Sequence, residues 1–289
     1  MLNTRLSKAF YLCNSFLLLA TPFTANHKSP NAVILPKEKN VTEVVALTTT
    51  EDRNSMEPEI KLNKKEALFV RKYIKYRGDC LVNVKKRSVI PFDIIDSIFT
   101  IYNIPVELKY LAVIESELKP TALSHVGARG PWQLMPGTAK VLGLKVNRHL
   151  DERTNFTMST RAAARYLKDL YAQFDDWLLV IAAYNGGPKP VHRAIRESGS
   201  KNFWVLQKHL PAESREHVKK FIATHYYFEG HGSETTLTRS EYMNYIQQVN
   251  AFDMQQKTRI DAPVESSEQK FKRIMQESEL SLKKSGKLI

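Results

Sequence analysis

The sequence predicts an all-α domain over residues 64–230, flanked by a signal peptide, a linker and a polar tail. Apolar residues recur at helical spacing through nearly all of this segment, and no part of it alternates as a substantial β-strand would. Proline occupies positions 91, 105 and 136, where the first turn of a helix tolerates it. A short hairpin between Leu144 and Arg153 is the one piece of β-structure that the pattern leaves open.

Length and composition are those of a globular protein. The chain has 289 residues, of which 43% are apolar and 25% charged, and these values exclude collagen-like, low-complexity and wholly disordered classes. The formal net charge is +13, and residues 61–230 hold 28 Lys and Arg against 16 Asp and Glu. A segment this basic suggests a polyanionic partner such as nucleic acid, anionic lipid or a bacterial cell wall.

Residues 1–25 have the features of a signal peptide. Arg5 and Lys8 precede an apolar run from Ala9 to Ala20, and the small residues Ala20 and Ala25 offer cleavage points. The run is shorter than the roughly 20 apolar residues of a membrane-spanning helix. We therefore expect export to the periplasm or cell envelope, with membrane attachment only if the signal stays uncleaved.

The rest of the chain divides by composition. Residues 26–63 show no sustained period and many Pro, Asn, Thr and Glu residues, which predicts a flexible linker. Residues 231–289 form a polar tail, partly helical or disordered, in which the weakly amphipathic run Glu268–Lys284 is a candidate partner-binding helix. Between them we expect helices over Lys64–Tyr76, Pro91–Tyr102, Pro105–Leu118, Pro136–Leu142, Thr157–Gln173, Trp177–Tyr184, Lys189–Glu197 and Ala212–Phe228.

The helix expected over Pro105–Leu118 carries an acid, Glu115, in the middle of its apolar stripe. Ionised carboxylates are costly to bury and rarely lie inside a protein without a partner. One explanation is a buried ion pair with an arginine. The other is an acid whose pKa burial raises, so that it keeps a proton and donates it to a leaving oxygen, as glycosidic cleavage requires. Glu117 points to the opposite side and is expected to be an ordinary surface acid.

Two further motifs contain groups that suit a sugar. The loop Ser124–Pro136 (SHVGARGPWQLMP) has two glycines three residues apart and combines flat apolar surface with an amide, in Trp132, Gln133 and Met135. The second motif, Ala183–Pro188 (AYNGGP), ends an apolar helix. A helix C-cap explains its glycines and proline, but it does not explain Tyr184 and Asn185.

Together the three motifs resemble the soluble-lytic-transglycosylase domain, a family of goose-lysozyme-like enzymes that cut bacterial peptidoglycan. The likeness covers residues 65–229 and is strongest to the D-type branch of membrane-bound lytic murein transglycosylases. It implies a lysozyme-like catalytic domain over residues 64–230. It also implies that Glu115 is the sole catalytic acid and base, and that the glycan is bound by Ser116, Ser124, Gln133, Met135, Tyr184 and Asn185.

The resemblance implies cleavage of the MurNAc–GlcNAc bond without water, leaving 1,6-anhydro-MurNAc ends. The acids between Pro120 and Gly187 fit helix starts, caps or a solvated face, and none lies in a motif expected to line the groove: they are Asp151, Glu152, Asp169, Asp175 and Asp176. A mechanism with a single acid fits this inventory. No cofactor is expected, and no metal, because the chain lacks an HExxH motif. The alternatives are a non-catalytic wall-binding scaffold and a hydrolytic lysozyme. A nucleic-acid partner is disfavoured by the export signal.

The chain departs from the family pattern near the last helix of the domain. The family reads Thr-Arg-x-Tyr-Val-Pro where this chain has Ser214–Lys219, with His217 in place of the tyrosine. This departure affects the rim of the expected groove and leaves the acid in place. Residues 231–289 do not resemble the LysM wall-binding modules common in the branch. We therefore expect the basic surface of the domain to hold the chain to the anionic wall.

Overall fold

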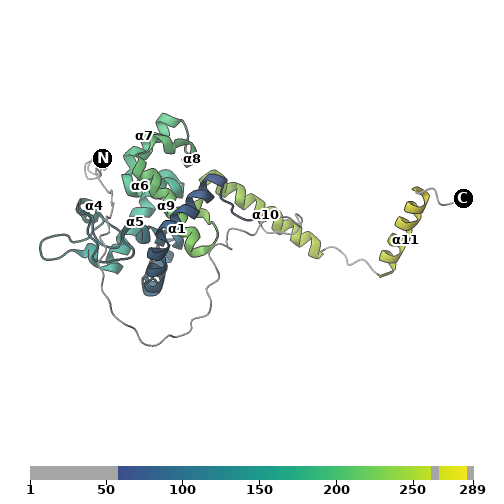
Figure 1. The fold of residues 1–289 in the computed structure, drawn as a ribbon, viewed down its shortest axis with the longest axis horizontal. Helices are drawn as coiled ribbons and strands as arrows, with labels where there is room; N and C mark the ends of the chain where they lie inside the picture. The colour runs from purple at the N-terminus through teal and green to yellow at the C-terminus, as the bar shows by residue number, and fades with distance from the viewer. Residues whose placement is uncertain (1–57, 262–266, 285–289) are drawn as a thin grey trace, which may run out of the picture. The chain divides into compact units, whose positions relative to one another are not determined.

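The computed structural model describes residues 58–261 and 267–284 and separates the chain into two compact units, 1–245 and 246–289 (Figure 1). The predicted signal peptide and nearly all of the predicted linker lie outside the described residues. In the first unit, helices surround one hydrophobic core, and the described residues form no β-strand. The prediction of an all-α domain is confirmed.

The helices of the first unit lie close to the predicted ones. The 3₁₀ turns of the described residues lie at 106–109, 152–154, 207–209 and 234–236. The α-helices are α1 (Lys64–Arg87), α2 (Val89–Tyr102), α3 (Tyr110–Ser116), α4 (Pro136–Val141), α5 (Phe156–Phe174), α6 (Trp177–Gly186), α7 (Pro188–Ser198), α8 (Phe203–Leu206) and α9 (Ala212–Glu229), and α10 (Arg239–Asp261) begins in this unit.

Two helices differ from the prediction in length. Helix α1 starts with a capping box between Asn63 and Glu66 and continues past Tyr76 to Arg87, because buried residues in its second half pack into the core. The predicted helix Pro105–Leu118 is divided into a 3₁₀ turn and the short α3. It ends at Ser116 because the next two residues adopt left-handed conformations, which carry Leu118 into the core.

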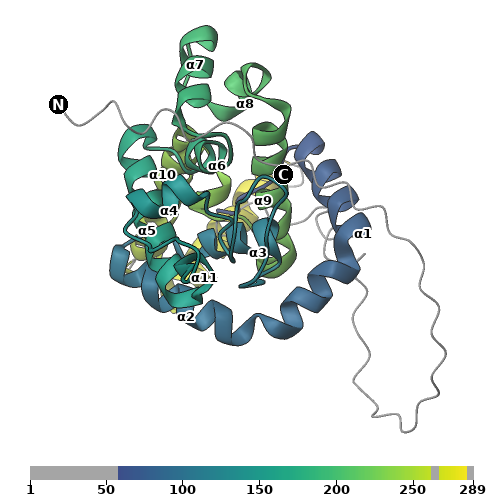
Figure 2. The same ribbon diagram turned by 90° about the vertical axis from the view of Figure 1, so that its left-hand side faces the viewer.

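Helix α6 lies at the centre of the unit. Every residue from Trp177 to Tyr184 is buried, as expected for a helix that is apolar on all sides. It contacts α5, α7 and α9, and α9 in turn contacts α1 and α3. Figure 2 shows α9 between α6 and α1, with α3 beside α9. Five of the seven residues of α3 are buried, so this helix lies inside the domain.

The hairpin left open by the sequence is present only as one isolated antiparallel bridge, between Val146 and Asp151. The turn is closed by hydrogen bonds, in which the Lys145 amide donates to Glu152 Oε2 at 2.6 Å and the Asn147 amide donates to the Leu150 carbonyl at 2.9 Å. The segment is too short for a ladder of backbone pairs.

The second unit contains the rest of α10 and α11 (Ser267–Lys284). A helix thus covers the run that the sequence indicated as weakly amphipathic, with Phe271, Ile274 and Met275 exposed on it. A protein partner for this helix stays a prediction. Within the described ranges no helix has the length and apolar character needed to cross a membrane.

Candidate active site

Glu115 lies near the end of α3 with only 7% of its side chain exposed. Its neighbours on the helix, Leu111 and Ala112, are fully buried, so the acid does lie in an apolar stripe. No arginine of the described residues pairs with it. The partner is instead His217 of α9, whose Nε2 atom is 3.4 Å from Glu115 Oε1 and whose side chain is 9% exposed.

The surroundings of this pair keep it uncharged. Burial raises the pKa of Glu115 to about 8, with a further increase from the negative charge of Glu213 and a decrease from Lys220. Burial, together with the charge of Lys220, lowers the pKa of His217 to about 3. Both shifts follow from the cost of removing a charge from water. Near neutral pH, Glu115 therefore holds a proton and His217 is a neutral imidazole.

The loop that follows α3 is held by hydrogen bonds from α3 and α6. Ser116 Oγ donates to the Pro131 carbonyl at 2.8 Å, and the Tyr184 hydroxyl donates to the Trp132 carbonyl at 2.8 Å. Both side chains are buried. Two of the predicted sugar-binding residues, Ser116 and Tyr184, thus donate their hydroxyl hydrogens to backbone carbonyls of the loop. The bond from Ser116 holds the loop against α3, the helix that carries Glu115.

A second set of contacts joins α6 to α9. Ser214 Oγ donates to Asn185 Oδ1 at 2.9 Å, and a hydrogen bond also links Asn185 to Glu213. With the His217–Glu115 contact, these interactions connect α3, the loop, α6 and α9 in a closed ring. The structure therefore brings Ser116, Tyr184 and Asn185 into one network around Glu115.

Ser124, Gln133 and Met135 belong to the loop itself. Ser124 Oγ accepts from the Ala128 amide at 2.9 Å, and Gln133 Nε2 donates to the Gly130 carbonyl at 2.9 Å. Gln133 has a positive φ of 46° and is half-buried, and the half-buried Met135 directly precedes α4. In the part of the chain that is described, the hydrogen bonds of these two side chains stay within residues 122–133, between α3 and α4.

Arg153, which the sequence did not indicate, holds this loop from its far side. Its Nη1 donates to the carbonyls of Gly127 and Leu134 at 2.7 and 2.9 Å, and its Nη2 lies 2.7 Å from Asp151 Oδ2. Gly130 has a φ of 86°, and a Cβ there would overlap the backbone carbonyl of Arg153. The glycine is required by this close approach, whereas one arginine among many basic residues gave no signal in the sequence.

Glu213 is the second residue that sequence reasoning missed. It lies at the start of α9, outside the region between Pro120 and Gly187 where the other acids were found. Its carboxylate raises the pKa of Glu115, so the site contains two interacting acids. The acids within that region behave as expected: Asp176, for example, caps α6 by accepting from the Leu179 amide at 3.1 Å.

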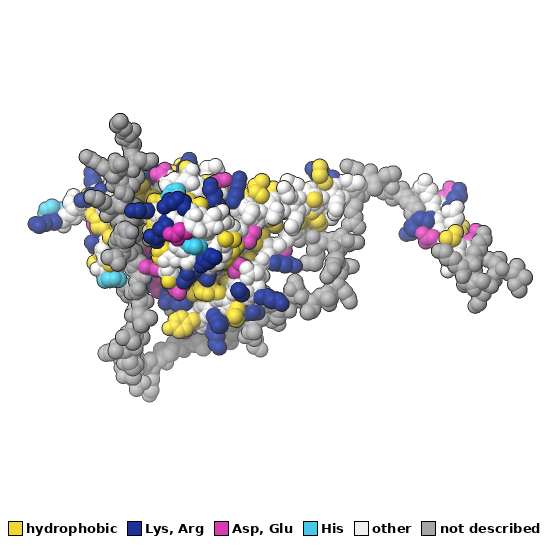
Figure 3. All heavy atoms as spheres, turned by 90° about the horizontal axis from the view of Figure 1, so that it is seen from above, with side chains coloured by type: hydrophobic (Ala, Val, Ile, Leu, Met, Phe, Trp, Pro, Cys, Tyr) yellow, Lys and Arg dark blue, Asp and Glu magenta, His cyan; other side chains and the backbone are white. Residues whose placement is uncertain are grey.

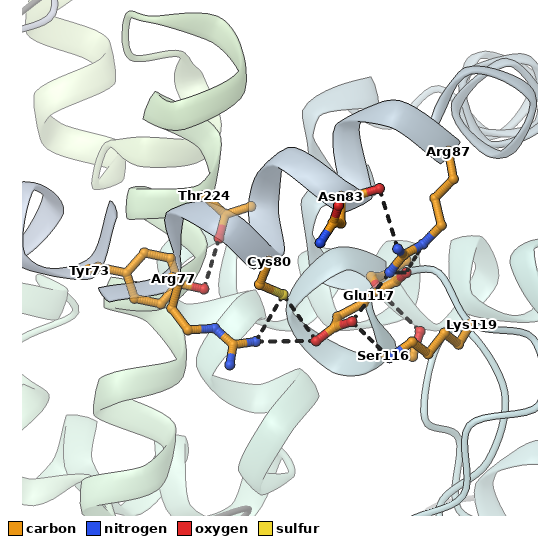
Figure 4. A network of polar contacts seen from close by, with 10 residues as sticks. Tyr73, Arg77, Cys80, Asn83, Arg87, Ser116, Glu117, Lys119 and Thr224 are labelled. Atoms are coloured by element: carbon orange, nitrogen blue, oxygen red, sulfur yellow. Dashed lines mark hydrogen bonds and ion pairs between the residues drawn. The ribbon is translucent and has the colours of Figure 1, made fainter. Parts of the chain in front are cut away.

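Glu117 is not an ordinary surface acid, and that prediction is wrong. Figure 4 shows it turned toward α1, where its carboxylate contacts Arg77, Arg87 and Lys119 at 3.4, 3.3 and 2.8 Å. The thiol of Cys80 donates to it at 3.0 Å. Burial opposes ionisation, but the hydrogen bonds from Lys119 and Cys80 outweigh it and hold the pKa of Glu117 below its ordinary value. This cluster ties the end of α3 to α1.

No group of three or more His, Cys, Asp or Glu side chains in the described ranges is placed to hold a metal ion. The site consists of one buried, protonated carboxyl, a neutral histidine and a second carboxyl, beside a loop stiffened by backbone hydrogen bonds. Such an arrangement can deliver a proton and take one back.

Part of the chain is similar in sequence to known proteins. Residues 99–207 match the family model described as Transglycosylase SLT domain. The chain is 40% identical over 126 residues to membrane-bound lytic murein transglycosylase D of Escherichia coli (strain K12). The aligned region covers 42% of this chain and 27% of that protein. It is 32% identical over 125 residues to the soluble lytic murein transglycosylase of the same strain, and this aligned region covers 39% of this chain and 19% of that protein.

The chain thus spans less than a third of the length of these two relatives. Among solved structures, the 70 kDa soluble lytic transglycosylase of Escherichia coli matches with a TM-score of 0.46 and 23% identity, over 63% of this chain and 33% of that one. The matched residues 99–207 include Glu115, the Ser124–Pro136 loop and the Ala183–Pro188 motif. This segment of the chain is similar to the transglycosylase SLT domain family.

Proposed function

We propose that this protein is a lytic murein transglycosylase, which cleaves the β-1,4 bond between MurNAc and GlcNAc in peptidoglycan and leaves a 1,6-anhydro-MurNAc end. The observation that carries the proposal is the buried carboxyl of Glu115, protonated near neutral pH, within a transglycosylase SLT domain. An acid in that state can protonate the oxygen of a glycosidic bond, which an ordinary carboxylate at neutral pH cannot do.

The proposed reaction needs one carboxyl and no water. Glu115 gives its proton to the oxygen that links the two sugars, and the bond from that oxygen to the anomeric carbon of MurNAc breaks. Positive charge develops at that carbon, where the neighbouring 2-acetamido group can stabilise it. The Glu115 carboxylate then takes the proton of the sugar's own 6-hydroxyl, whose oxygen bonds to the anomeric carbon. The nucleophile belongs to the substrate, so its proximity replaces a second catalytic carboxylate.

We infer two roles for the predicted sugar-binding residues. Gln133, Met135 and Asn185 are only half-buried, so they can contact the glycan. The hydroxyl groups of Ser116, Ser124 and Tyr184 are bonded to backbone atoms, so these residues act by shaping the loop.

A hydrolytic lysozyme is the second candidate, because Glu213 brings another carboxyl to the site. Glycosidases that use water place a second carboxylate to activate it. Against this role, the Glu213 carboxyl is hydrogen-bonded to Asn185. We therefore assign Glu213 an electrostatic role, in which its charge helps to keep the proton on Glu115.

The proposed place of action is the cell envelope, where the substrate is found. The signal peptide expected in residues 1–25 and the name of the membrane-bound relative support it. Many Lys and Arg side chains are spread over the face seen in Figure 3, between a smaller number of acidic ones, and they can hold the protein to an anionic wall.

The test is release of soluble muropeptides from purified sacculi by the wild-type protein, Glu115→Gln and Asp169→Asn. Gln keeps the shape of the side chain but has no proton to give, so we expect release to fall about 10³-fold. Asp169 is an exposed acid on α5 and its variant should match the wild type. Products one water lighter than hydrolytic muropeptides identify the transglycosylase. Release by Glu115→Gln at the wild-type rate contradicts the proposal, and binding without release by the wild type favours a scaffold.

A further inference from the structure

The contact between His217 and Glu115 has an unusual geometry. The Nε2 atom of His217 is buried and lies 3.4 Å from Glu115 Oε1, yet it forms no well-aligned hydrogen bond with any described residue. Buried polar atoms are nearly always paired in native proteins, and an unpaired one calls for an explanation. Its position 3.4 Å from the proposed catalytic carboxyl supplies one, because hydrogen bonds in empty active sites are often long or poorly aligned and tighten when the substrate binds.

The ring of His217 takes part in this contact as a neutral group. Burial keeps it uncharged, so Nε2 either carries a hydrogen and donates, or lacks one and accepts. If Nε2 accepted, it would hold the carboxyl proton on Oε1, in a hydrogen bond to the histidine. If Nε2 donates to Oε1, the proton resides on Oε2 and stays available for transfer.

We propose that His217 is a positioning residue, whose Nε2–H donates to Oε1 of Glu115, leaves the transferable proton on Oε2 and stabilises the carboxylate formed once that proton has moved. This inference rests on the proposed function, since it concerns the same carboxyl. No proton is exchanged with the histidine in either half of the reaction. A preorganised donor aimed at developing negative charge lowers the barrier of the step that creates the charge.

Other groups around the carboxyl act through charge and not through a directed hydrogen bond. Glu213 and Lys220, both on α9, respectively raise and lower the pKa of Glu115. Asn185 of α6 is bonded to Ser214 and Glu213. Among the residues that the structure describes, His217 is therefore the neighbour whose polar atom forms an ion-pair-range contact with Oε1, at 3.4 Å.

The identity of the donor makes the proposal testable. Replacing His217 with Phe keeps an aromatic ring but removes the donor, Gln restores an N–H and Tyr restores an O–H. We expect His217→Phe to lower kcat about 10²-fold with little change in KM, and Gln and Tyr to regain most of that loss. Because the lost hydrogen bond favours the ionised carboxylate, the substitution should also raise the pKa of Glu115, by about one pH unit. The alkaline limb of the pH profile should move upward by the same amount in the Phe variant.

A second readout does not require turnover. The pKa of Glu115 can be measured in the full chain by NMR titration of carboxyl-labelled glutamate, with Glu115→Gln to identify its signal. His217→Phe should raise this pKa, while Gln and Tyr should hold it near the wild-type value. Equal losses in all three variants, or unchanged kcat and pKa in the Phe variant, overturn the proposal. If the wild type cleaves no peptidoglycan, the proposed function fails, and the titration still decides whether His217 donates to Glu115.

Discussion

At the scale of single residues, the protonation of Glu115 controls the pH dependence of the proposed reaction. The free enzyme needs the protonated acid, and its pKa is about 8. We expect kcat/KM to be level between about pH 5 and 7 and to fall about tenfold for each further unit above pH 8. Initial rates of muropeptide release across this range provide the measurement. A decline that is complete by about pH 6 indicates an ordinary carboxyl and contradicts the account.

The same pKa predicts a cost in stability. Between pH 4.5, the ordinary value, and about 8, the folded protein holds a proton that the unfolded chain releases. The contribution of Glu115 to the free energy of unfolding is therefore fully present below pH 4.5 and decreases as the pH rises toward about 8. Glu115→Gln has no such group, so it should unfold at the wild-type temperature near pH 4.5. Near pH 8 it should be more stable by roughly 2–5 kcal/mol.

Thermal unfolding of both proteins at the two pH values measures the effect. Asp169→Asn, which changes an exposed acid, serves as the control and should show no pH-dependent difference. If Glu115→Gln lowers the unfolding temperature by the same amount at both pH values, the carboxyl is not destabilised by ionisation in the folded protein.

At the scale of elements, the loop between α3 and α4 offers a matched pair of glycines. Gly127 and Gly130 have φ values of 88° and 86°, so alanine is strained at both. A Cβ at Gly127 meets nothing, whereas one at Gly130 overlaps the carbonyl of Arg153. We expect Gly127→Ala to cost about 1 kcal/mol and Gly130→Ala more than about 2 kcal/mol. Chemical denaturation measures both costs, and equal costs contradict the close approach.

Individual helices were predictable because their periodicity and caps are local. Asp176 and Trp177 mark the start of α6 in the sequence as clearly as in the structure. The position of Glu115 in an apolar stripe also predicted its burial. The ends of α1 and α3 were harder to predict, because packing against α9 extends the first, and the left-handed residues Glu117 and Leu118 end the second.

Contacts between elements were beyond the reach of the sequence. His217 appeared there as a departure at the rim of a groove, and the structure places it against the acid itself. Arg153 and Glu213 act across the fold on residues distant in the chain. Glu117 was expected to be solvated because helix periodicity does not reveal that α1 covers that face of α3. Tertiary packing decides these cases.

At the scale of the whole molecule, the charge predicts how the protein meets its substrate. Residues 61–230 carry nearly all of the net charge of +13. The bacterial wall is anionic, so sedimentation of the Glu115→Gln protein with sacculi should be strong in dilute buffer. It should weaken severalfold near 1 M salt, where the screening length falls to about 3 Å. Salt-independent sedimentation would mean that contacts of the glycan with the site around Glu115, and not the basic surface, provide the attachment.

The central claim is that the sugar's own 6-hydroxyl, and not water, attacks the anomeric carbon. Digestion of sacculi in water enriched in heavy oxygen, followed by mass spectrometry of the released muropeptides, tests it most directly. The account predicts anhydro ends that contain no solvent oxygen, with wild-type protein and with Glu213→Gln alike. Heavy oxygen at the MurNAc reducing end, lost in Glu213→Gln, would contradict it and assign the site to a hydrolytic lysozyme.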